Sequence, residues 1–142
     1  MLGVTTTKLR RIQTVGGDVL HGMKNIDAGF DGFGEVYFSF IKPQQVKGWK
    51  RHEKMTLNFV VPVGEIQVCV CDEKSGDSSS FVLGPRTDEL YNRLTIRPGL
   101  WVAFGGLGST ESLLVNIASI PHDPTEATNV PLDSFSWSWP KA

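Results

Sequence analysis

Short apolar segments, rich in β-branched and aromatic residues and divided by turn signals, are the feature that most limits what this chain can form. Clusters of glycine, proline and aspartate separate them, as in KSGD at 74–77 and GGLGST at 105–110. No segment of ten or more residues has the apolar spacing of a helix. The pattern predicts an all-β sandwich or closed jelly roll. The expected strands occupy residues 35–41, 55–63, 65–71, 80–83, 92–97, 100–104 and 113–119, with another near 12–15.

The length of the chain, 142 residues, fits one domain that can bury its own core. We expect residues 34–120 to form the body of this single domain, preceded by an N-terminal arm at 1–33. Residues 121–142 form a tail rich in proline and tryptophan, which should pack over the body. In its SFSWSWP segment, Trp137 and Trp139 alternate with serine and should share one face.

The formal net charge of −1 and an isoelectric point near 6.3 give the chain no overall attraction for nucleic acid. We expect neither a secretory signal nor a membrane span, because no apolar run reaches roughly 18 residues. Cys69 and Cys71 are two residues apart on an expected strand, a spacing that pairs poorly as a disulfide. We interpret them as reduced core or interface thiols of a cytoplasmic protein. A metal site would need a second cysteine pair, which the sequence lacks.

Alternation in the segment 55–63 predicts which of its side chains are buried. Every second residue is apolar, so one face of the strand should belong to the core. Thr56 and Asn58 lie on the opposite face, which we expect to meet solvent or a dimer partner. The expected core residues are Met55, Leu57, Phe59, Val61 and Val63.

The segment KGWKRHEK at 47–54 surrounds one of only 3 histidines, His52, with four basic side chains. Two interpretations follow. The segment is a basic loop that enters a core strand, or it is a site that binds an anion and moves a proton. If the segment is extended, Lys50 and His52 share a face.

Three stretches, DGFGE at 31–35, KGWKRH at 47–52 followed by VPVGEI at 61–66, and IRPGLWVAF at 96–104, resemble the cupin jelly roll in their order and spacing. More narrowly, they resemble the dTDP-4-dehydrorhamnose 3,5-epimerase family over roughly residues 27–140. The resemblance implies a homodimeric barrel that binds a nucleotide-diphospho-4-keto-6-deoxysugar at one mouth, with neither a metal nor another cofactor. A base would remove a proton next to the ketone, and an acid would return one to the resulting enolate.

The resemblance also implies roles for individual residues. Lys50 falls at the position of the family's catalytic histidine, so His52, two residues further on, is the expected base. Lys50 would stabilise the enolate, or act as the base if burial depressed its pKa. Asp133 resembles the tail aspartate that orients the family's histidine. Lys47 falls where the family has an arginine that contacts the substrate.

Other positions keep two interpretations. Arg51 is a phosphate ligand or a surface charge, and Trp101 is a platform for a base or sugar ring or a core residue. Glu35 matches a family glutamate by position. Val115 occupies the place of the family's acid tyrosine, so Tyr37 is either a displaced acid or an ordinary strand tyrosine. We expect His122 to be peripheral.

A metal-dependent cupin is the first competing class, and only one of its four usual ligand positions holds a histidine. Those positions hold Lys50, His52, Leu57 and Val102. We therefore expect a metal-independent isomerase or epimerase. The alternatives are a sugar-nucleotide 3,4-ketoisomerase, which moves protons between adjacent carbons, and a non-catalytic module that binds a nucleotide sugar.

Overall fold

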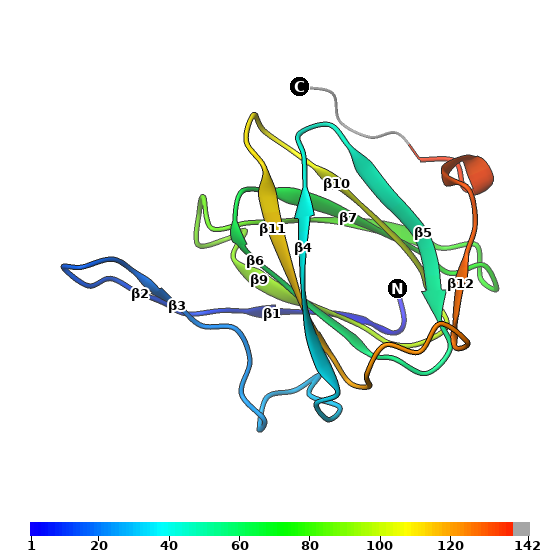
Figure 1. Cartoon of the computed structure of the whole chain (residues 1–142), viewed down its shortest axis with the longest axis horizontal. Helices are drawn as coiled ribbons and strands as arrows, with labels where there is room; N and C mark the ends of the chain where they lie inside the picture. The colour runs from blue at the N-terminus through cyan, green and yellow to red at the C-terminus, as the bar shows by residue number, and fades with distance from the viewer. Residues whose placement is uncertain (138–142) are drawn as a thin grey trace.

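The computed structural model of the chain describes residues 1–137, which form antiparallel strands and a short 3-10 helix (Figure 1). One five-stranded sheet has the order β1-β9-β6-β11-β4 and the other the order β12-β5-β10-β7-β8. A two-stranded hairpin, β2-β3, projects from the body. The elements are β1 Val4–Lys8, β2 Arg11–Ile12, β3 Val19–Leu20, β4 Glu35–Ile41, β5 Val46–His52, β6 Leu57–Val63, β7 Ile66–Cys71, β8 Ser78–Leu83, β9 Asn92–Ile96, β10 Trp101–Gly106, β11 Ser112–Ala118, β12 Ala127–Asn129 and the helix η1 Leu132–Ser134.

The main core lies between the two five-stranded sheets. Alternate residues of β6 point into it from one sheet, and alternate residues of β7 point into it from the other, as the two-residue period of a strand requires. The seven strands expected from the apolar segments are all present, with ends that agree to within two residues. The expected all-β architecture is therefore confirmed.

The face of β6 that carries Asn58, with Thr56 just before the strand, differs from the sequence expectation. Thr56 and Asn58 are 0% and 2% exposed, because residues 22–31 cover this face of the sheet. The side-chain amide of Asn58 donates to the carbonyl of Gly29 at 3.0 Å, and Thr56 donates to Asp31 at 2.8 Å. The expectation of a face open to solvent is wrong, because hydrogen bonds within the chain satisfy these polar groups.

Val63, expected in the core, is 54% exposed. The register between β11 and β6 shifts by one residue between Leu113 and Val115. Because side chains alternate with a period of two, a one-residue shift turns the following side chain to the other face. Val63 therefore points away from the core.

The N-terminal residues belong to the first sheet. β1 pairs with β9 from Val4 opposite Ile96 to Lys8 opposite Asn92, so it forms an edge of the first sheet. The expected arm at 1–33 is therefore wrong for residues 4–8. Further along, the fully buried Arg93 donates to the carbonyls of Gly22 and Ala28, both at 3.0 Å, and holds the covering segment on the sheet.

The tail starts beside the first sheet, where His122 contacts Glu35 of β4, and then follows the second sheet from Ala127 onward. β12 pairs with β5, with Ala127 opposite His52. Phe135 then packs on the outer face of this sheet, with its ring centroid 5.1 Å from that of Trp49. The expected place of Trp139 lies outside the described residues. The pairing of β12 with β5 also places Glu126, the residue before β12, at the end of β5, next to His52.

A bulge in β5 sets the direction of its basic side chains. Lys47 lies opposite Phe104 and Lys50 opposite Val102, with a register shift between the two pairs. The shift places Lys47, Lys50 and His52 along one cavity despite their uneven spacing. Gly48 makes this possible: its φ is 138°, and a Cβ there would meet the Ala103 Cα at 2.7 Å.

Candidate active site

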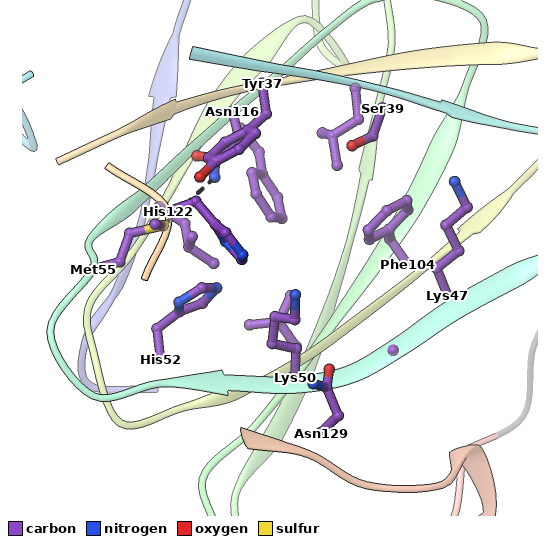
Figure 2. A pocket seen from close by; sticks show the side chains of 15 residues that line it. Tyr37, Ser39, Lys47, Lys50, His52, Met55, Phe104, Asn116, His122 and Asn129 are labelled. Atoms are coloured by element: carbon purple, nitrogen blue, oxygen red, sulfur yellow. Dashed lines mark hydrogen bonds between the residues drawn. The ribbon is translucent and has the colours of Figure 1, made fainter. Parts of the chain in front are cut away.

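A cavity of about 470 Å³ opens between the two sheets at one end of the barrel (Figure 2). Its volume falls within the range of about 300–1,000 Å³ that is usual for small-molecule sites. Its lining combines apolar and polar side chains. It consists of Tyr37, Ser39, Lys47, Gly48, Lys50, His52, Met55, Leu57, Phe59, Val102, Phe104, Leu114, Asn116, His122 and Asn129.

The best-defined polar contact of the site joins His52 to Glu126. Nδ1 of His52 lies 2.5 Å from Oε1 of Glu126, and the carboxylate is buried. The other oxygen, Oε2, accepts the backbone N–H groups of Glu53 and Lys54, both at 2.9 Å. Because an ionised carboxylate can only accept a proton from Nδ1, this contact favours the tautomer in which Nε2 is the proton acceptor, as a base requires.

The surroundings of Glu126 keep it ionised. Burial raises the pKa of its carboxyl, but the hydrogen bonds from His52 and from the backbone of Lys54 outweigh burial and lower the pKa below its ordinary value. An ionised carboxylate behind the ring orients the imidazole and would stabilise its protonated form. His52 and Glu126 therefore have the geometry of a general base and its orienting group.

Glu126 replaces Asp133 as the partner of His52, which corrects the sequence expectation. Asp133 lies in η1 and is exposed, beyond the end of β12. Its resemblance to a tail aspartate rested on a short motif, whereas position beside His52 is decided by the pairing of β12 with β5. The sequence contained no local signal for Glu126.

Lys47 and Lys50 place two ammonium groups in the same cavity as His52 (Figure 2). Nζ of Lys47 donates to the carbonyl of Phe40 at 2.6 Å, across the mouth between β5 and β4. The side chain of Lys50 points into the cavity between Lys47 and His52. The carboxylate of Glu126 lies behind the ring of His52, so the open side of the cavity favours an anionic ligand.

Arg51 and Trp101 lie on the outer face of the second sheet, which corrects their expected role as substrate ligands. Arg51 pairs with Glu53 at 2.7 Å and Glu73 at 3.2 Å, and its guanidinium lies 4.7 Å from the centre of the Trp101 ring. Trp101 is buried in a cluster with Trp49. Neighbouring residues of a strand face opposite ways, so Arg51 points away from the cavity that Lys50 and His52 line.

The same outer cluster holds Cys69 and Cys71, which are free and buried as expected. Burial raises the pKa of the Cys69 thiol and that of the Cys71 thiol. Both groups therefore stay protonated and serve as core residues.

The wall opposite β5 brings His122 next to Glu35 and Tyr37 of β4. Glu35 accepts the backbone N–H of His122 at 3.0 Å, and the ring of His122 meets that of Tyr37 edge-on, with centroids 6.3 Å apart. Burial, and then the nearby carboxylate of Glu35, raise the pKa of Tyr37 to about 12. Tyr37 therefore keeps its proton near neutral pH. Glu35 affects the cavity through its contacts with Tyr37 and His122.

Sequence reasoning also missed His122 as a residue of the cavity. It follows Pro121 in a turn-like segment, and we expected it to be peripheral. Nothing local marks it, because its place at the cavity depends on how the chain leaves β11 and on the bond to Glu35.

Metal donors are not grouped in the described part of the chain: among residues 1–137, no three His, Cys, Asp or Glu side chains are placed to hold an ion. In the same range, no helix is long and apolar enough to cross a membrane.

Comparison with solved structures finds close likeness. A dTDP sugar isomerase from Desulfovibrio desulfuricans G20 is 39% identical over 96% of this chain and 91% of its own, with a TM-score of 0.89. A dTDP-4-dehydrorhamnose 3,5-epimerase from Sulfolobus tokodaii is 19% identical over 96% of this chain and 82% of its own, with a TM-score of 0.81. A sugar 3,4-ketoisomerase from Thermoanaerobacterium thermosaccharolyticum, solved with TDP, is 19% identical over 90% and 88%, with a TM-score of 0.76. No protein-family model and no curated protein matches the sequence.

These findings, together with the barrel and its cavity, define an enzyme of the cupin jelly-roll class. The chain belongs to the family of dTDP-sugar isomerases and epimerases, which confirms the resemblance seen in its sequence.

Proposed function

We propose that this protein isomerises or epimerises a dTDP-4-keto-6-deoxysugar by removing a proton from a carbon next to the ketone. The observation that carries the proposal is the His52–Glu126 pair, which shares one cavity with Lys50. The 39% identical relative is a dTDP sugar isomerase, which supports the same class of substrate.

Proton removal follows from the geometry of His52. Nε2 takes the proton, the C–H electron pair becomes part of the enolate double bond, and charge moves to the former ketone oxygen. The ammonium of Lys50 is the group of this wall that is suited to stabilise that oxygen. Glu126 stabilises the imidazolium that forms, as the carboxylate does in other His–carboxylate pairs.

Substrate binding uses the rest of the cavity. Lys47, at the mouth, offers a cation to the diphosphate, although it lacks the two-pronged geometry of arginine. The neutral phenol of Tyr37 is a hydrogen-bond donor for the sugar from the opposite wall. We also infer that the reaction needs no metal, because Lys50 occupies a position where metal-dependent cupins have a metal ligand. Addition of a chelator should therefore leave activity unchanged.

A homodimer is part of the proposal. β4 is an edge strand, and its outward side chains Val36, Phe38 and Phe40 are 38%, 64% and 57% exposed. An apolar edge strand is prone to pair with another chain unless it is covered. A second copy of this chain is the occupant we propose. The cytoplasm stays the predicted location.

Incubation with dTDP-4-keto-6-deoxyglucose in deuterated water tests the function. Deuterium at C3 and C5 supports an epimerase. Deuterium at C3 alone, with the carbonyl moved to C3, identifies a 3,4-ketoisomerase. Binding of the sugar nucleotide without any exchange contradicts catalysis and leaves a binding module.

A further inference from the structure

His122 and His52 enter the cavity from opposite walls. His52 extends from β5 of one sheet, whereas His122 follows β11 of the other, and both rings point toward the space between them (Figure 2). Two imidazoles on opposite sides of one cavity are the arrangement that a reaction with two proton transfers requires, because histidine both accepts and donates protons near neutral pH.

The backbone of His122 is held in place while its ring stays accessible. Its N–H donates to Oε1 of Glu35 at 3.0 Å, and its ring meets the edge of Tyr37. The residue is exposed, whereas the side chain of His52 is only 11% exposed and is tied to Glu126. His122 is therefore open to exchange of protons with bulk water, whereas His52 is far less open to water.

We propose that His122 returns the proton that completes the reaction, on the face of the sugar opposite to His52. The inference rests on the proposed function. His52 removes a proton from carbon and leaves an enolate. His122, in its protonated form, then transfers a proton to carbon, the enolate electrons form the new C–H bond, and the carbonyl is restored. One proton leaves the substrate and one arrives, so the step needs no oxidant or reductant.

The other candidate donor fits this role less well. Tyr37 is half-buried beside Glu35, whose carboxylate helps to hold its proton. His52 lies on a single wall, so it reaches one face of a ring that fills the cavity. A proton delivered from the opposite wall inverts the configuration at the carbon that lost its proton. This arrangement favours epimerisation over a proton transfer along one face of the sugar.

Replacement of His122 by alanine, with turnover followed by NMR of the sugar nucleotide, tests the proposal. Turnover should fall about 10²- to 10⁴-fold, as is typical for loss of a general acid, with KM nearly unchanged. Added imidazole should restore part of the rate, because the site is open to water. His21→Ala, outside the cavity, is the matched control and should behave as wild type.

Two results overturn the inference: His122→Ala turning over like wild type, or a loss that imidazole does not restore. His122→Gln, a more conservative change, guards against misfolding and should lose the same turnover with an unchanged melting temperature. Failure of the proposed function is separate, because the wild-type protein would then show neither exchange nor product.

Discussion

Nδ1 of His52 and Oε1 of Glu126 lie 2.5 Å apart although 74 residues separate them in the chain. The contact exists because β12 adds to the edge of β5 and brings Glu126 to the end of that strand. The buried carboxylate selects the tautomer of the ring and turns Nε2 toward the cavity.

Replacement of His52 by asparagine should abolish solvent exchange while the protein still binds dTDP. Asparagine keeps a hydrogen-bonding group toward Glu126 but cannot accept a proton from carbon. We expect turnover to fall about 10²- to 10⁴-fold. Deuterium incorporation and calorimetric titration of dTDP measure the two effects; exchange at the wild-type rate would rule out His52 as the base.

Replacement of Glu126 by glutamine should lower both turnover and stability, and the stability loss should depend on pH. The pKa of Glu126 is lowered in the folded protein, so its contribution is present above the ordinary value of 4.5 and disappears as pH falls through the folded pKa. The variant should lose about 1–3 kcal/mol at neutral pH. Urea unfolding at neutral pH and below pH 4.5 measures the free energy of unfolding of both proteins. A difference between wild type and variant that is larger in acid than at neutral pH would contradict the prediction.

Replacement of Lys47 by alanine should weaken dTDP binding, most of all at low salt, because an ammonium at the mouth attracts the diphosphate. Arg51→Ala removes the same charge from the outer face and is the matched control. We expect its affinity to stay within about threefold of wild type. Binding measured over a range of salt concentrations separates the two, and equal losses would show that Lys47 acts only through overall charge.

Replacement of Trp101 by phenylalanine should reduce stability and leave turnover unchanged. Trp101 packs in the outer cluster, and its indole N–H donates to Glu73 at 3.0 Å. Loss of that hydrogen bond and part of the packing should cost about 1–3 kcal/mol. Chemical denaturation gives the stability, and the turnover assay gives the activity. A selective loss of substrate affinity would instead restore Trp101 as a substrate platform.

Replacement of Phe38 by lysine should convert the proposed homodimer to monomers. The side chain is 64% exposed on edge strand β4, where a charge opposes pairing with a second copy. Sedimentation analysis of wild type and variant at equal concentrations measures the change. Lys74→Glu, in the turn after β7, is a control that should leave the assembly as it is. A wild-type protein that is monomeric throughout would contradict the proposed dimer.

The sequence by itself determined the strands, the burial of most of the 55–63 face and the shared face of Lys50 and His52. These features depend on side chains a few residues apart, and the two-residue period of a strand relates such side chains directly. The family resemblance was also carried by short motifs that can be read in order along the chain.

Tertiary structure alone decided the rest. The pairing of β12 with β5 brings Glu126 to His52, and a hydrogen bond to Glu35 holds His122 at the cavity. Both contacts join residues more than 70 positions apart in the chain. Residues 22–31 cover Asn58, whereas the register shift beside Leu113 exposes Val63. Which segment covers a face, and in which register, follows from packing of the whole barrel, so local pattern could not place these residues.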